Sequence, residues 1–166
     1  MRIEEDMKLD YKDVLIRPKR STLGSRKDVD LERGFTFRNY KGPRPMHRHY
    51  RGTPIMASNM DGVGTFEMAD TLATGGIFTC LVKTYSVNEL VGYFDQDDRS
   101  HDPARTEYVA MSIGITDADH AKFRDVYEQV NDRLKYVCID VANGYSSRFR
   151  DTAVSYTHLR AHETDS

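Results

Sequence analysis

From residue 54 onward, short apolar runs typical of buried strands alternate with patterns typical of helices. The strand-like runs cover 54–60, 77–83, 108–113 and 136–141. Strands that alternate with helices pair in parallel, and each helix crosses over right-handedly to the next strand. The alternation therefore predicts an α/β fold with about four parallel strands, which is either half of an eight-stranded barrel or a small open sheet.

Local helix signals fill the gaps between these runs. A helix is expected over 65–74, where two glycines then end it. Ser86 and Glu89 have the spacing of a capping box for a second helix. Thr116 is expected to cap a third helix that extends through Val130. These signals support helical crossovers between the strands.

Polar or small side chains follow each expected strand. The run before Asp140 is apolar and rich in β-branched residues, so it predicts a strand buried on both faces. Loops at the carboxyl ends of parallel strands gather at one edge, where ligands bind. Lys83 and Asp140 can then pair or hold two ends of a polar ligand, although Asp140 could instead only cap its turn. The full set is Asn59, Asp61, Lys83, Ser112, Gly114, Asp140 and Asn143.

The N-terminal segment has a different character. Residues 8–41 mix short apolar patches with turn residues and charges. This mixture predicts an N-terminal segment in an extended, turn-rich conformation, which wraps a core formed by later residues. Its basic stretch, Arg17 to Arg26, can face an anionic ligand or form a solvated face. Residues 42–53 are expected to be a loop in which His47 and His49 are exposed rather than metal ligands.

Composition excludes several function classes. The 166 residues carry a formal charge of −2, which argues against a nucleic-acid partner. No apolar run is long enough for a membrane span, and the N-terminus is too polar for a signal peptide, so a cytoplasmic protein is expected. Cys80 and Cys138 lie in strand-like runs and are expected to be buried, reduced thiols.

Three separated stretches have a family resemblance. They are MRIEEDMKLDYKDVLIRPKRSTLGSR at the N-terminus, NMDGVGTFEMA at 59–69 and CIDVANGYS at 138–146. Together they resemble the IMP dehydrogenase/GMP reductase family, and its reductase branch in particular, over nearly all of 1–149. The resemblance implies a (β/α)8 TIM barrel, a homotetramer, and NADPH-dependent reduction of GMP to IMP and ammonia in purine salvage.

The resemblance also implies site residues. Cofactor contacts fall on Ser25 and Arg26, which would reach a neighbouring subunit's NADPH, and on four residues at the strand ends, Lys83, Asp140, Val141 and Ala142. Asn59, Met60 and Asp61 would lie near the substrate. The family usually has histidines on both sides of the lysine, whereas Val82 and Thr84 flank it here.

Family features of the second half of the barrel have no match in this chain. They include the nucleophilic cysteine loop, which attacks C2 of the purine, and a potassium site. Residues 1–153 are therefore expected to be the N-terminal half of a truncated barrel, without enzymatic activity. Residues 154–166 match nothing in the family and read as a translated sequencing adapter, expected to be disordered, so no metal is assigned to its His158 and His162.

Two other functions stay open at this point. The first alternative is a fragment of IMP dehydrogenase, the oxidoreductase that acts on IMP. Most such enzymes insert regulatory domains where this chain has only the short loop 95–106. A non-catalytic, nucleotide-binding half-barrel is the second.

Overall fold

The computed structural model describes residues 6–37, 49–96 and 105–159, which form two separate units. The first unit ends at Asp30, and its described residues are all exposed. It contains two short 3-10 helices, Tyr11–Asp13 and Arg26–Asp28, each preceded by a capping box. Residues 6–30 are thus extended and turn-rich, as expected, while their packing around a core stays a prediction.

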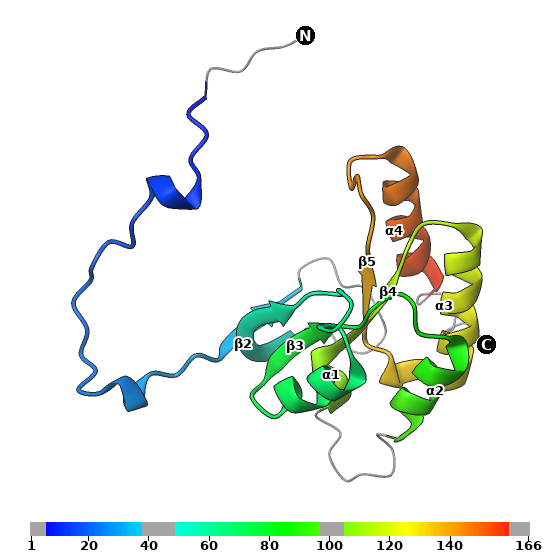
Figure 1. The fold of residues 1–166 in the computed structure, drawn as a ribbon, viewed down its shortest axis with the longest axis horizontal. Coiled ribbons are helices and arrows are strands. Elements are labelled where there is room, and N and C mark those ends of the chain that lie inside the picture. The colour runs from blue at the N-terminus through cyan, green and yellow to red at the C-terminus, as the bar shows by residue number, and fades with distance from the viewer. Residues whose placement is uncertain (1–5, 38–48, 97–104, 160–166) are drawn as a thin grey trace. The chain divides into compact units, whose positions relative to one another are not determined.

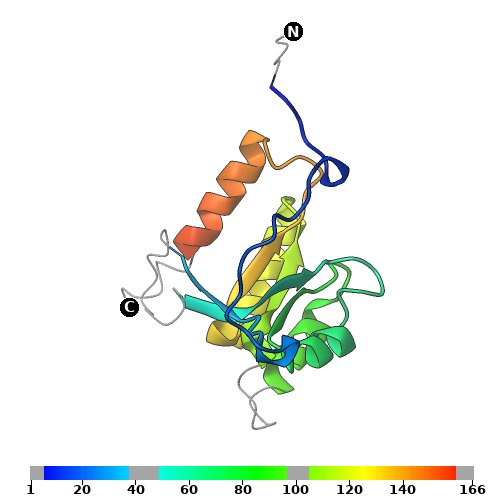
Figure 2. The same cartoon turned by 90° about the vertical axis from the view of Figure 1, so that its left-hand side faces the viewer.

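The second unit is built on a five-stranded sheet in the order β1-β2-β3-β4-β5 (Figure 1). Strands β2 to β5 pair in parallel, so the predicted α/β fold with four parallel strands is confirmed. Figure 2 shows β4 and β5 side by side. The bounds are β1 Arg33–Thr36, β2 His49–Ala57, β3 Ile77–Cys80, β4 Val109–Ile113 and β5 Tyr136–Ile139.

Strand β1 and the first half of β2 differ from the expectation of irregular structure. They form an antiparallel pair in which Phe35 lies opposite Tyr50. His49 therefore lies in a strand, where its Nδ1 is 3.1 Å from the Thr36 hydroxyl, whereas His47 lies outside the described residues. The β2–β3 register shifts around Pro54, which has no amide hydrogen to give to the ladder.

Four helices follow strands β2 to β5. Helices α1 and α3 begin where the sequence predicts, because Thr65 and Thr116 accept hydrogen bonds from amides in the first turns. The predicted capping box of Ser86 and Glu89 is also present at the start of α2. The bounds are α1 Phe66–Ala73, α2 Val87–Gln96, α3 Asp117–Val130 and α4 Ser147–Leu159.

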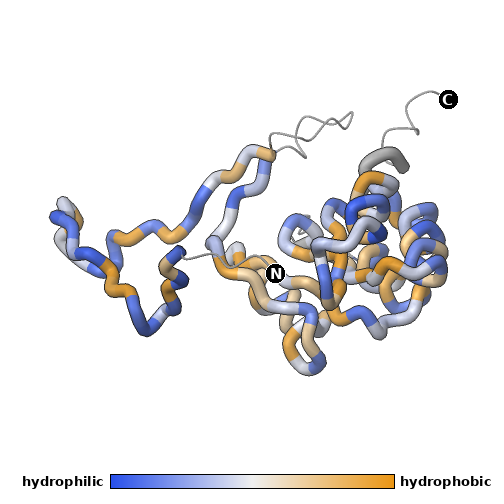
Figure 3. The backbone as a smooth tube through the Cα atoms, turned by 90° about the horizontal axis from the view of Figure 1, so that it is seen from above, coloured by the Kyte–Doolittle hydropathy of each residue, from blue (hydrophilic) through white to orange (hydrophobic). Residues whose placement is uncertain are grey.

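Alternate strand residues face two different environments. Val109, Met111 and Ile113 of β4 are fully buried in the core shared with the helices. Phe78 and Cys80 of β3 belong to a smaller cluster, together with Ala110 and the half-buried Tyr50, Tyr108, Tyr136 and Cys138. In Figure 3 the hydrophobic stretches run through the interior of this unit. The helices therefore cover one face of the sheet, and the other face carries aromatic and sulfur side chains. The expectation that the strand before Asp140 is buried on both faces is wrong, because all four residues of β5, at the edge of the sheet, are half-buried.

Helix α4 extends into the stretch that was expected to be disordered. Residues 154–159 are helical, and Tyr156 is buried against α3, stacked on His120 and edge-on to Phe123. An aromatic side chain that buries its ring accounts for order at this point. Residues 160–166 lie outside the described part, and the adapter origin of the tail stays a prediction.

Candidate functional site

Lys83 and Asp140 meet at the carboxyl ends of the parallel strands. The Lys83 Nζ lies 3.2 Å from the Asp140 Oδ2, and each side chain keeps 42% of its surface exposed. The ladder fixes Asp140, whose amide donates to the Ile113 carbonyl at 2.8 Å. The structure thus brings together two residues that the sequence placed on one rim, and leaves both accessible to a ligand.

Lys122 of α3 supports the turn that carries Lys83. Its Nζ donates to the Lys83 carbonyl oxygen at 2.8 Å. Burial lowers the pKa of Lys122, although the nearby carboxylates of Asp119 and Glu89 oppose this shift. The sequence analysis missed Lys122, because nothing local links a lysine on one helix to a carbonyl 39 positions earlier.

Asp119 is part of the same charged rim. Burial raises its pKa, but hydrogen bonds from Thr116 and Gly114 and the charge of Lys83 outweigh burial, so the pKa lies below its usual range. The Thr116 amide donates to the Asp119 Oδ2 at 3.0 Å. Two lysines and three carboxylates therefore form one network around the ends of β3 and β5: Lys83, Lys122, Glu89, Asp119 and Asp140.

The predicted substrate residues, Asn59, Met60 and Asp61, lie in the turn after β2. The Met60 carbonyl accepts from the amides of Val63 and Gly64 at 3.0 and 2.8 Å. Gly64 in turn accepts from the Val82 amide at 2.7 Å, next to Lys83. The turn is therefore joined to the rim through backbone hydrogen bonds.

The remaining predicted cofactor residues are exposed or half-buried. Val141 and Ala142 directly follow Asp140, in a loop held by the Asn143 side chain, which accepts from the Tyr145 amide at 2.9 Å. Ser25 and Arg26 lie in the N-terminal unit, where the Ser25 hydroxyl accepts from the Lys27 amide. Because the two units are described separately, the predicted role of Ser25 and Arg26 stays a prediction.

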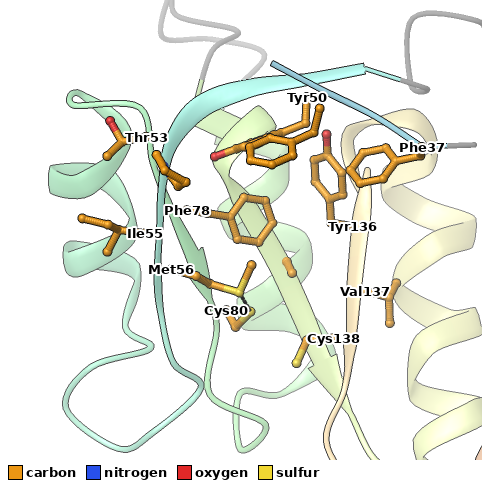
Figure 4. A pocket seen from close by; sticks show the side chains of 13 residues that line it. Phe37, Tyr50, Thr53, Ile55, Met56, Phe78, Cys80, Tyr136, Val137 and Cys138 are labelled. Atoms are coloured by element: carbon orange, nitrogen blue, oxygen red, sulfur yellow. Dashed lines mark hydrogen bonds between the residues drawn. The ribbon is translucent and has the colours of Figure 1, made fainter. Parts of the chain in front are cut away.

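Behind the rim, a cavity of about 520 Å³ opens on the face of the sheet opposite the helices (Figure 4). Its wall is mostly aromatic and aliphatic, with Phe37, Tyr50, Phe78 and Tyr136 toward one end and the sulfur-containing side chains of Met56, Cys80 and Cys138 toward the other. Tyr50 contacts Phe78 and Tyr136 edge-on. Such a surface excludes water from a bound planar group.

The two thiols in this cavity interact with each other. Cys80 is buried and Cys138 is half-buried, and both are free, which agrees with the expected reduced thiols. A hydrogen bond with Cys80 lowers the pKa of Cys138 to about 6; the Ser112 hydroxyl and Lys83 act in the same direction, while burial and Asp140 oppose it. The same hydrogen bond, together with burial, raises the pKa of Cys80.

A sequence model of the "IMP dehydrogenase / GMP reductase domain" matches residues 8–163, so the match extends into the stretch after residue 153 that was expected to match nothing in the family. The chain belongs to this family. Its fold agrees with a crystal structure of inosine 5′-monophosphate dehydrogenase from Legionella pneumophila, with a TM-score of 0.64 at 18% identity, over 91% of this chain and 40% of that one.

Curated relatives narrow the comparison to one branch. GMP reductases from Escherichia coli O81 (strain ED1a), Shigella boydii serotype 4 (strain Sb227) and Klebsiella pneumoniae subsp. pneumoniae are each 50% identical over 149 residues. Each match covers 90% of this chain and 40% of the relative. The chain therefore spans less than half the length of the relatives that it matches.

No helix in the described ranges is both long and apolar enough to cross a bilayer.

Proposed function

We propose that this chain is the N-terminal part of a GMP reductase, which replaces the 2-amino group of GMP by hydrogen to give IMP and ammonia, with NADPH as the reductant. The observation that carries the proposal is the 50% identity to GMP reductases over a stretch that includes both Lys83 and Asp140. The proposal extends to purine salvage, a cytoplasmic location and a homotetramer of the whole protein.

The rim suits the nicotinamide end of the cofactor. NADPH, when bound, supplies the hydride. Lys83 offers ammonium donors and Asp140 offers carboxylate acceptors, and their partial exposure lets them bind a carboxamide and ribose hydroxyls. Val141 and Ala142 would contact the same end, and the 59–61 turn would lie beside GMP.

Ser25 and Arg26 would act at the other end of the cofactor. A hydroxyl and a guanidinium are suitable donors for phosphate or adenine groups. We propose that they reach the NADPH of a neighbouring subunit, so their role requires the assembled protein.

We further propose that the 166 residues alone do not turn over GMP. The chain covers only 40% of the curated relatives, and the nucleophilic cysteine loop and the potassium site would belong to the remainder. Within this proposal, residues 154–166 derive from a sequencing adapter. Long-read sequencing of the locus tests that origin, and a natural gene that encodes the tail would exclude it.

A second candidate is the corresponding part of an IMP dehydrogenase, because the family model that matches the chain describes both enzymes. The two candidates run in opposite redox directions. A non-catalytic nucleotide-binding half-barrel is the third possibility for the isolated chain.

A chimera separates these candidates. Residues 1–149 would replace the matching part of the Shigella boydii GMP reductase, and activity would be followed as NADPH consumption with GMP or NAD reduction with IMP. We expect GMP-dependent NADPH consumption and ammonia release. A chimera that folds as a tetramer but only oxidises IMP would overturn the proposal.

Substitution of the rim lysine tests the site within that chimera. Lys83→Met is expected to lower kcat/KM for NADPH by at least about tenfold, since each lost charge-assisted hydrogen bond contributes about 1.5–3 kcal/mol. Lys12→Met, an exposed lysine of the N-terminal unit, is the matched control and is expected to leave kcat/KM unchanged. Equal effects of the two substitutions would exclude the proposed role of Lys83.

A further inference from the structure

The half-buried Lys122 side chain connects helix α3 to the turn between β3 and α2. Its Nζ lies 2.8 Å from the Lys83 carbonyl oxygen, although the two residues are 39 positions apart in the chain. An ammonium that donates to a carbonyl makes a charge-assisted hydrogen bond, which is stronger than a neutral one. The contact therefore holds the main chain at Lys83, whose side chain is the proposed cofactor contact.

The same segment is also anchored on both sides of Lys83. Before it, the Val82 amide donates to a carbonyl of the turn after β2 at 2.7 Å. After it, the Ser86 amide donates to the Glu89 carboxylate at 2.7 Å. These bonds fix the ends of the segment, whereas Lys122 acts on the residue that carries the rim ammonium. Lys122 is thus suited to set the position of Lys83 between two fixed points.

The first turns of α3 contact the ends of two neighbouring strands. Lys122 holds the segment after β3, and Asp119 packs against Gly114, the residue after β4. A Cβ at Gly114 would fall on the Asp119 carboxylate. The charges of Asp119 and Glu89 favour the ammonium form of Lys122, against the larger effect of burial. Helix α3 is therefore placed to fix the geometry of the rim from behind.

We propose that Lys122 is a positioning residue for the cofactor and acts through Lys83. By holding the Lys83 main chain, it keeps the Lys83 ammonium 3.2 Å from the Asp140 carboxylate, where both groups can bind the nicotinamide end. Binding groups that are held in place before a ligand arrives lose less entropy on binding. In this role Lys122 makes no contact with the cofactor itself. The inference rests on the proposed reductase function.

Kinetics of the chimera test this role. Lys122→Met keeps a long apolar side chain and removes the donor. We expect it to lower kcat/KM for NADPH at least about fivefold, through a higher KM for NADPH, because the charged hydrogen bond that orders Lys83 is lost. The KM for GMP should stay unchanged. A general loss of folded enzyme would instead lower the apparent kcat and leave the KM for NADPH as it is.

Two further variants serve as controls. Lys122→Arg should restore most of the loss, because a guanidinium can also donate to the carbonyl. Arg124→Met is the matched control, because it removes an exposed cation from the same helix. It is expected to leave both KM values unchanged.

A double variant shows whether Lys122 acts through Lys83. In the Lys83→Met background, the ammonium that Lys122 positions is gone. Lys122→Met should then have no further effect on kcat/KM for NADPH. Effects of the two substitutions that simply add would mean that Lys122 acts on the cofactor independently, and would overturn the proposal.

Hydrogen exchange of the 166-residue chain tests the contact without turnover. Lys122→Met should speed exchange in peptides that cover 82–86, whereas Arg124→Met should not. Unchanged exchange in Lys122→Met would overturn the role of Lys122, as would an unchanged KM for NADPH in an active chimera. Inactivity of the chimera without any substitution would instead contradict the proposed reductase function.

Discussion

Gly64 shows how one residue holds the turn after β2 against the end of β3. A Cβ at this position would fall on the Cys80 carbonyl oxygen and within 2.8 Å of the Val82 amide nitrogen. Both are backbone atoms, so neither can move as a flexible side chain would. Only glycine allows this approach, which places the 59–61 turn beside the segment that carries Lys83.

We expect Gly64→Ala to lower the free energy of unfolding by about 1–3 kcal/mol, the usual cost of forcing an extra methyl group into a packed site. Chemical denaturation measures the change. Gly92→Ala is the control, because a Cβ at Gly92 in α2 meets nothing within 4 Å. It should stabilise the chain by up to ~1 kcal/mol. An unchanged free energy of unfolding for Gly64→Ala would show that this turn packs less closely on the Cys80 and Val82 backbone than the structure has it.

At the residue scale, the sequence could predict Lys83 and Asp140 but not their neighbours. Both follow strand-like runs, and the rule that carboxyl ends of parallel strands share one edge brings them together. Lys122 reaches the Lys83 carbonyl only because α3 packs beside the turn after β3. Cys80 and Cys138 line one cavity only because β3 and β5 belong to the same sheet. No spacing in the sequence reports such contacts.

At the element scale, helix α3 depends on a charged cap. Asp119 accepts from the Thr116 amide, and Thr116 accepts from the Asp119 amide, at 3.0 and 3.2 Å. Because hydrogen bonds and Lys83 hold the pKa of Asp119 below its usual range, its contribution to stability is present above about pH 4. It is lost as the pH falls through the lowered pKa.

Asp119→Ala should therefore cost about 1 kcal/mol of unfolding free energy at neutral pH. The difference from the unmodified chain should shrink below about pH 4. Denaturation series at several pH values measure both effects. Asp125→Ala, in the middle of the same helix and exposed, serves as the control and should show a smaller change. A pH-independent difference would contradict the role of the charge.

The elements that the sequence missed are those with weak periodic patterns. The parallel strands are recognisable in the sequence as apolar runs, most clearly β3 and β4, whose side chains are largely buried on both faces of the sheet. Strand β1 is four exposed residues, and the first half of β2 mixes histidine, arginine and glycine. Their pairing depends on contact with each other rather than on burial, so local sequence carries little signal for it.

At the scale of the whole molecule, stability should reside in residues 31–159. The described part of the first unit, residues 6–30, has no buried side chain. A variant that keeps Met1 and lacks 2–30 is therefore expected to change the free energy of unfolding by less than about 0.5 kcal/mol, as for surface changes in general. Thermal and chemical denaturation test this, and a loss of several kcal/mol would show that the segment packs on the core.

The bond between Lys122 and the Lys83 carbonyl has a consequence for ligand exchange. The tether holds the main chain at this point and leaves the Lys83 ammonium to rotate. An incoming polar group can displace Asp140 as its partner while the turn stays in place. Such an exchange sacrifices one half-exposed ion pair, which contributes about 1 kcal/mol or less. A polar ligand could therefore replace this ion pair without rearrangement of the turn and with little loss of stability.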